Sequence, residues 1–543
     1  MTAPSSDPPD PDAPAPAAKP AGASAGRGVL YIAFAKFYFM IGGLLIQIRL
    51  PSLLSRVVFG AYGFVSSVVS PFNNVMVTGS IQAVSRFTAQ KPETARAVER
   101  AGLRMHLYVG LPVALLFIAG APLVSWAIKD PTKTVPLMVS GVIIGGYSFY
   151  AVLIGTANGQ REFHKQAGLD IAFTTLRVTG ILGMAMAGLG LVGVVAGWVA
   201  AVGAILMIAT VWVGLPGRTA EKVPVGPMLR YFLGVAVYLA LFNVLMFVDT
   251  WLVKRLTSDW YAAHADHFAG AIDRALPWAR EVTGFHYDPA QLADVQVAYY
   301  TAVQTLARLS YQAIIAATFV VFPLVSKSTL EGDQDTTRRY VHVTMRYSLM
   351  FSTAIAVVMA ANPEWLLRLP FPADYAALGA PALSALALGN VAFSIFAIAG
   401  TILNGAGYTK DAIITAAVTL VVAIIGNLIV IPQLHPGADV LLGAALVTGS
   451  AMFIGACLVG WRLHVRLGAF IPLLSVVRVG VAILAGIAVG WVVPFQTPLM
   501  TLVEAALVGV VFLAVLIATG ELGRKDLAAI KSVRAKRGQG DAA

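Results

Sequence analysis

The sequence predicts an all-α polytopic membrane protein with about fourteen transmembrane helices, and three observations support this fold class. Apolar stretches long enough to cross a bilayer follow one another from Val29 to Gly520. Of the 543 residues, 58% are hydrophobic and 12% are charged, whereas an ordinary soluble domain carries about 25% charge. A few charges lie in the middle of apolar stretches. Such a charge costs about 2.5–3.5 kcal/mol to insert, so it usually marks a pathway or a binding site.

The length of each apolar stretch sets the predicted helices, because a spanning helix needs about 20 apolar residues. Residues 1–28 are rich in proline and alanine and hold too few large apolar residues to pack, so we expect a disordered cytoplasmic tail. Residues 521–543 are expected to form a second cytoplasmic tail. The predicted spans are residues 29–50, 62–81, 105–127, 135–157, 169–188, 190–213, 230–252, 297–325, 345–362, 377–402, 411–432, 441–461, 473–493 and 498–519.

The distribution of lysine and arginine predicts the orientation in the membrane. Basic residues concentrate in segments 86–104, 327–346 and 524–537, and such segments are retained on the cytoplasmic side. Both termini are therefore expected in the cytoplasm, and residues 256–296 form a predicted periplasmic insertion. The net charge of +11 is then explained by anionic lipid, so no nucleic-acid partner is expected.

Short repeated motifs predict a duplicated architecture. Val84-Ser85-Arg86 at the end of the second span recurs as Val325-Ser326-Lys327 at the end of the eighth, 241 residues later. Asn158-Gly159 recurs as Asn404-Gly405, 246 residues later, although chance could explain this pair alone. Because both copies would begin in the cytoplasm, the repeat is parallel.

The duplication divides the chain into domains. The N-terminal lobe comprises residues 29–215, the C-terminal lobe residues 230–464, and residues 473–520 form an appended helix pair. Transporters with a parallel repeat keep the substrate site between their halves and rock one half against the other.

Five segments resemble the polysaccharide-flippase branch of the multidrug/oligosaccharidyl-lipid/polysaccharide exporter superfamily. They are residues 54–63 (LSRVVFGAYG), 79–86 (GSIQAVSR), 298–302 (AYYTA), 322–327 (FPLVSK) and 402–407 (ILNGAG). The resemblance implies fourteen helices, two six-helix lobes around a central cavity, and outward transport of lipid-linked saccharides. Two departures are the long segment 256–296 and the absence of the charged opening motif associated with dedicated lipid II flippases.

A polar stripe on the eighth span is the main candidate site. Residues Gln296, Tyr300, Gln304, Arg308 and Gln312 recur every four residues. Four residues turn a helix by about 400°, so the stripe winds slowly along one side, as expected for a helix that lines a wet cavity. The alternative is an arginine that hydrogen-bonds neighbouring helices as part of their packing.

Two further cations lie within predicted spans. Lys36 is in the first span and Arg177 in the fifth. Either could extend to the cytoplasmic headgroups, and Asp170, seven residues before Arg177, could pair with it. If Lys36, Arg177 and Arg308 converge, they would suit a pyrophosphate, because charge-assisted hydrogen bonds are about twice as strong as neutral ones.

Neutral and acidic residues complete the candidate set. Asn73 and Asn74 in the second span and Asn243 in the seventh could bind sugar hydroxyls or bond neighbouring helices. Asp249 could bind a coupling proton or sodium ion, or form a salt bridge with the nearby Lys254 or Arg255. Glu504 is an isolated carboxylate without a predicted role. We predict no metal site and no cofactor.

These patterns favour a flippase of the bacterial inner membrane that moves polyprenyl-pyrophosphate-linked oligosaccharide to the outer leaflet. The mid-depth charges are basic, which favours an anionic substrate. Alternatives in the same superfamily are a lipid II flippase and a cation-coupled drug exporter, and an alternative of another class is a membrane polysaccharide polymerase or ligase. We do not expect the protein to be an enzyme. Its expected partners are the lipid-linked substrate and the bilayer, with a polymerase or glycosyltransferases as further candidates.

Overall fold

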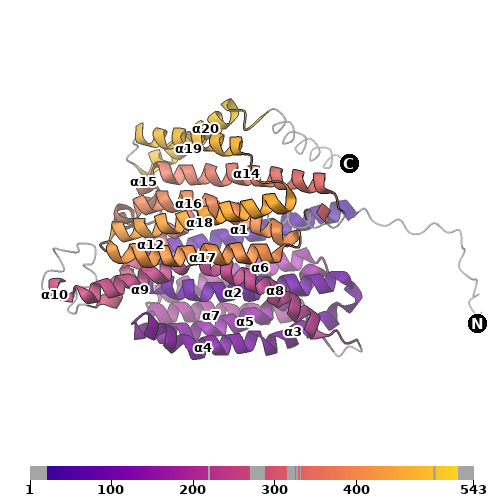
Figure 1. Cartoon of the computed structure of the whole chain (residues 1–543). Coiled ribbons are helices and arrows are strands. Elements are labelled where there is room, and N and C mark those ends of the chain that lie inside the picture. The colour runs from indigo at the N-terminus through magenta and orange to yellow at the C-terminus, as the bar shows by residue number, and fades with distance from the viewer. Residues whose placement is uncertain are drawn as a thin grey trace, which may run out of the picture.

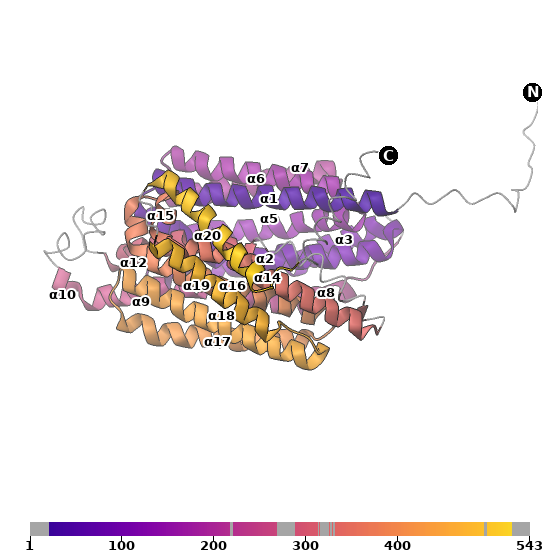
Figure 2. The same ribbon diagram turned by 90° about the horizontal axis from the view of Figure 1, so that it is seen from above.

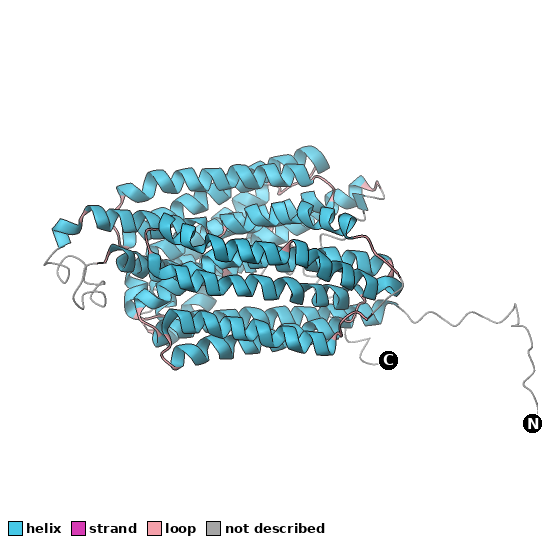
Figure 3. Ribbon diagram, turned by 90° about the horizontal axis from the view of Figure 1, so that it is seen from below, coloured by secondary structure: helices cyan, strands magenta, loops and turns pink. Residues whose placement is uncertain are grey.

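The computed structural model describes residues 21–217, 221–268, 288–312, 314, 325, 328–329, 332–492 and 497–523. In these residues the regular structure is helical throughout, and the long helices run side by side in one bundle (Figure 1). Short loops join most of them (Figure 3). The all-α polytopic fold class is confirmed.

The N-terminal lobe contains α1 (Ala21–Leu53), α2 (Arg56–Gln90), α3 (Ala95–Tyr108), α4 (Gly110–Ala127), α5 (Thr134–Gly159), α6 (Phe163–Met186) and α7 (Gly190–Trp212). The C-terminal lobe contains α8 (Val225–Leu245), α9 (Val248–Ala263), α10 (Ala265–Phe268), α12 (Pro289–Ala307), α14 (Gln334–Ala361), α15 (Pro363–Arg368), α16 (Ala373–Gly405), α17 (Thr409–Val430) and α18 (Ala438–Leu467). The appended pair is α19 (Leu473–Val492) and α20 (Pro498–Ala518).

Among the described helices, twelve are long and apolar enough to cross a membrane. Each corresponds to one predicted span. The predicted span 62–81 corresponds to α2. The predicted span 297–325 begins within α12, and residues 313 and 315–324 of it lie outside the described residues. Helices α2 and α12 pack against each other where the lobes meet. Both carry polar residues, which a helix enclosed by protein tolerates better than a helix that faces lipid.

The same relative pairs of helices pack in both lobes. In the N-terminal lobe α5 contacts α2, α4 and α7, and α6 contacts α1 and α7. In the C-terminal lobe α16 contacts α12, α14 and α18, and α17 contacts α8 and α18. A duplication would produce this correspondence, and superposition of the two lobes by a rotation about the membrane normal stays a prediction. The α19–α20 pair packs on α14 (Figures 1 and 2).

The bundle has two distinct ends. Helix α1 begins and α20 ends at one end, which we call the termini end, while α9 ends beside α10 at the other, which we call the loop end (Figure 1). Helix α9 continues to Ala263 and α12 starts at Pro289, and residues 269–287 of the predicted insertion 256–296 lie outside the described residues. Helix α1 starts at Ala21, inside the predicted tail. The rest of that tail and residues 524–543 lie outside the described residues.

Candidate functional site

Phe39 on α1 brings two of the predicted cations together in the N-terminal lobe. The Lys36 ammonium lies 6.0 Å from the centre of the Phe39 ring, and the Arg177 guanidinium carbon lies 5.7 Å from it. Lys36 Nζ also binds Asp170 Oδ2 at 2.8 Å. The carboxylate that could have paired with Arg177 therefore neutralises Lys36 instead.

Arg177 has no counter-ion within 4 Å among the described residues. Its guanidinium carbon lies 5.0 Å from the centre of the Trp198 ring on α7, and its Nε is buried without a hydrogen-bond partner. The two aromatic rings fix the side chain by cation–π contacts without neutralising it. Lys36, Asp170 and Arg177 together keep a net charge of +1, and an unpaired charge at this depth can be neutralised by an anion.

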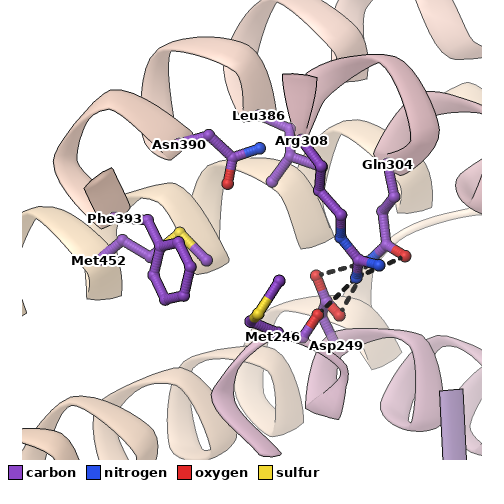
Figure 4. A pocket seen from close by; sticks show the side chains of 8 residues that line it. All are labelled: Met246, Asp249, Gln304, Arg308, Leu386, Asn390, Phe393 and Met452. Atoms are coloured by element: carbon purple, nitrogen blue, oxygen red, sulfur yellow. Dashed lines mark hydrogen bonds between the residues drawn. The ribbon is translucent and has the colours of Figure 1, made fainter. Parts of the chain in front are cut away.

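Arg308 lies elsewhere, in a pocket of the C-terminal lobe (Figure 4). Its Nη2 donates to the carbonyl oxygen of Met246 at 2.6 Å and to Gln304 Oε1 at 3.2 Å. The Met246 carbonyl is accessible because the chain leaves helical geometry at Phe247, between α8 and α9. A cation at the carboxyl end of α8 is also favoured by the helix dipole.

The polar stripe on α12 faces Asp249 at the start of α9. Tyr300 donates its hydroxyl to Asp249 Oδ2 at 2.7 Å, and Gln304 Nε2 lies 3.1 Å from both carboxylate oxygens. Asp249 is buried, and its predicted salt-bridge partners Lys254 and Arg255 bind other carboxylates. Tyr300, Gln304 and Arg308 thus form a polar network with Asp249 inside one lobe. Gln296 instead donates to the carbonyl oxygen of Gly437, and Gln312 is half-buried one turn beyond Arg308.

The structure therefore brings together Lys36 and Arg177 but joins neither to Arg308 by any contact in the described residues. The pocket around Arg308 is lined from the C-terminal lobe alone, by Met246, Asp249, Gln304, Arg308, Leu386, Asn390, Phe393 and Met452. Its volume is about 10 Å³, close to the room that one water molecule needs.

The predicted asparagines lie where α2 meets α8. Asn74 Nδ2 donates to Asn243 Oδ1 at 2.7 Å, which joins the two lobes, and Asn243 donates to the carbonyl oxygen of Leu239. Both amide atoms of Asn73 are buried without a partner. Asn74 and Asn243 thus make the interhelical bond that was the alternative to sugar binding.

A buried ion cluster at the loop end is the main feature that the sequence did not reveal. Lys133 Nζ binds Asp130 at 2.8 Å and Asp294 at 2.7 Å, and Lys254 Nζ binds the same carboxylates at 2.8 and 2.6 Å. All four side chains are at most 4% exposed. We call Asp130, Lys133, Lys254 and Asp294 the loop-end cluster.

The loop-end cluster joins the two lobes, because Asp130 and Lys133 precede α5 whereas Lys254 and Asp294 lie on α9 and α12. Burial raises the pKa of Asp130, but Lys254 and Lys133 outweigh burial and hold that pKa well below its usual range. Asp130 is therefore ionised at neutral pH.

Two further ion pairs join the lobes at the same end. Arg56 Nε at the start of α2 binds Asp374 Oδ2 at the start of α16 at 2.5 Å, and Tyr299 donates to the same oxygen. Lys129 binds Asp259 at 2.9 Å in a more exposed position. The described residues of the two lobes are thus held together by ion pairs at the loop end. No sequence pattern predicts these pairs, since their members lie 130 to 318 residues apart along the chain.

Comparison with known proteins agrees with this architecture. A family model described as MatE matches residues 290–429, and one described as polysaccharide biosynthesis protein matches residues 50–261. A structure of the lipid II flippase MurJ in an inward closed conformation is similar over 90% of this chain and 98% of that chain, with a TM-score of 0.67 and 14% identity.

The chain has the fold of the multidrug/oligosaccharidyl-lipid/polysaccharide exporter superfamily. The predicted resemblance to this superfamily is confirmed. An outward-facing structure of a multidrug resistance MATE family transporter of this superfamily is similar over 81% of this chain and 96% of that chain. Its TM-score is 0.56 and its identity 13%. No curated protein sequence matches the chain significantly.

Proposed function

We propose that this protein is a flippase of the bacterial inner membrane that carries a polyprenyl-pyrophosphate-linked oligosaccharide from the cytoplasmic to the outer leaflet. The observation that carries the proposal is the net positive group of Lys36, Asp170 and Arg177 within the N-terminal lobe. The un-neutralised Arg177 offers charge-assisted hydrogen bonds to a pyrophosphate. In this proposal the termini end faces the cytoplasm, in agreement with the basic segments assigned to that side.

Transport would proceed by alternating access of the two lobes. The loop-end cluster supports this mechanism through its charge distribution. When the lobes separate, Lys133 keeps Asp130 within the N-terminal lobe, and Lys254 keeps Asp294 within the C-terminal lobe. Each half stays neutral. Opening therefore leaves no lone buried charge, whereas loss of one partner from a buried pair typically costs about 3–5 kcal/mol.

The membrane potential could drive the reaction. Moving one elementary charge across the membrane is worth about 2.3 kcal/mol per 100 mV, and the cytoplasm is negative, so outward movement of an anionic headgroup is favoured. We keep Asp249 as the proposed site for a coupling cation, since its pocket has room for one small ion or water. This carboxylate is also the observation that favours the second candidate, a cation-coupled drug exporter.

The experiment compares variants of Arg177 in vesicles that contain a polyprenyl-pyrophosphate-linked oligosaccharide and carry a potassium diffusion potential. Hydrogen bonds to charged groups are worth about 1.5–3 kcal/mol, so Arg177→Ala should reduce flipping about ten- to hundredfold, and Arg177→Lys should reduce it less. Arg104→Ala removes an exposed arginine near the termini end and serves as the matched control.

Three results would contradict this reading. Wild-type flipping by Arg177→Ala would exclude the anion site. Flipping that ignores the potential but follows a sodium or proton gradient would place the driving force at an ion site such as Asp249. Sodium- or proton-driven export of cationic drugs, without movement of the saccharide lipid, would support the drug exporter. Vesicles that contain lipid II in place of the oligosaccharide lipid test the remaining alternative, a lipid II flippase.

A further inference from the structure

Two buried glutamates fasten α20 to the rest of the protein, one near each end of the helix. Glu521 follows the helix at the termini end and is 1% exposed. Its carboxylate binds Arg346 Nε of α14 at 2.8 Å and Arg478 Nη1 of α19 at 3.3 Å. Two cations thus neutralise this carboxylate, and the attachment is ionic.

Glu504, near the loop end of α20, has different surroundings. It is also 1% exposed, but its Oε2 accepts one hydrogen bond, from the Asn362 amide between α14 and α15. Its Oε1 is buried without a partner. The other residues that line this position are mostly apolar: Val358, Ala361, Leu366, Thr501, Ala505 and Val508.

None of the described elements packed against Glu504 offers it a counter-ion. On α15, Arg368 pairs with Glu364 at 2.5 Å. On α19, Arg478 binds Glu521. The basic residues of α14 precede Tyr347 and lie toward its termini end. Burying an isolated ionised carboxylate is so costly that such a group takes up a proton instead.

We propose that Glu504 is a proton-binding site and that its proton keeps the loop end of α20 docked on α14 and α15. Loss of the proton would place an unpaired carboxylate in an apolar interface, and the loop end of α20 would move away from α14 to hydrate it. The ionic attachment at Glu521 would hold the termini end in place. Glu504 lies six residues from the start of α20, which is about 9 Å along the helix, so the proton would exchange with water at the loop end.

This inference does not depend on the proposed transport substrate. It assigns the α19–α20 pair a response to the acidity of the loop-end compartment. Glu521 supplies a fixed attachment, and Glu504 supplies an attachment that exists only with a bound proton.

The test measures the distance between α20 and α14–α15 by spin labels in the purified full chain, with the exposed Cys457 replaced by serine. Labels at Leu502 and Leu369 report on the loop end, and labels at Ile517 and Val343 report on the termini end. All four side chains are exposed. The pH is varied from about 5 to about 9, an interval that extends from just above the usual pKa of glutamate to the pKa of deeply buried glutamates.

We expect the loop-end distance to be short in acid and to lengthen with a single titration as pH rises, while the termini-end distance stays constant. Glu504→Gln, which has the shape of the neutral acid, should stay docked at every pH. If Glu504→Gln does not fold, Glu504→Leu provides an uncharged side chain for the same position. A loop-end distance in the wild type that does not change with pH would overturn the proposal. So would a change of equal size in the uncharged variant.

Discussion

Lys254 illustrates how a single buried cation can hold two lobes together. Its ammonium contacts Asp130 of one lobe and Asp294 of the other, and it also donates to the carbonyl oxygen of Ala290 at 2.7 Å. The geometry satisfies its three N–H donors. Removing this group would leave two buried carboxylates to share the ammonium of Lys133.

The variant Lys254→Met should therefore destabilise the protein strongly. Breaking a buried ion pair by removing one partner costs about 3–5 kcal/mol, and the melting temperature in detergent should fall accordingly. The control is Lys129→Met, which removes an exposed pair with Asp259 that is worth at most about 1 kcal/mol. Equal melting temperatures for the two variants would contradict the structural role of the cluster.

The pH dependence of the cluster follows from the lowered pKa of Asp130. A carboxylate whose pKa is lower in the folded protein than in the unfolded chain stabilises the fold at pH values above the unfolded pKa, which is about 3.9 for aspartate. This contribution to stability is lost as the pH falls through the folded pKa. The difference in melting temperature between wild type and Asp130→Asn should thus be constant from about pH 8 to about pH 5. A difference that already declines over this interval would show that the cluster titrates. Any contribution of Glu504 is present in both proteins and cancels.

At the scale of elements, the contact between α2 and α12 determines how the lobes meet. Gly60 of α2 lies so close to α12 that a Cβ atom there would be 1.7 Å from the carbonyl oxygen of Asp294. Gly63, one turn later, faces the Thr301 side chain at 2.4 Å from its own Cβ position. Two glycines one turn apart allow this close approach, at the level of the loop-end cluster.

The variant Gly60→Ala should force α2 and α12 apart and favour a structure open at the loop end. The distance between spin labels at Lys129 and Asp259, in the protein without Cys457, measures this opening. Gly43→Ala on α1 is the control, because no atom lies within 4 Å of its Cβ position and alanine is the better helix former. The expected result is a longer distance in Gly60→Ala alone. An unchanged distance would mean that α2 and α12 shift without opening the lobes.

At the scale of the whole molecule, the two lobes are joined at the loop end by ion pairs that must separate if access alternates. A covalent link across the same end should therefore stop transport. We expect a short cross-linker between Lys129→Cys and Asp259→Cys to abolish flipping in vesicles, and a cleavable linker to restore it after reduction. The control link joins Arg255→Cys to Asp259→Cys within α9, where no relative motion of the lobes is needed. Continued flipping across the closed loop end would exclude alternating access.

The helical, polytopic architecture follows from hydropathy alone, because the length of an apolar stretch is a local property. The correspondence of α5 with the predicted fourth span and of α16 with the tenth shows how far this reasoning reaches. It also placed Lys36 and Arg177 at depths where a charge is informative. The sequence did not predict the helix breaks at Val109 and Phe247, inside the third and seventh predicted spans, because these are backbone irregularities within otherwise apolar stretches.

Contacts between helices that are distant in the sequence determine which charges pair. Lys36 takes the carboxylate of Asp170, and Arg177 is left with aromatic neighbours. Arg308 donates to the carbonyl oxygen of Met246 at the end of α8. These choices depend on the rotation of each helix about its axis and on contacts between segments far apart in the chain. Hydropathy and spacing along the sequence describe single helices, so they do not determine partners that other helices supply.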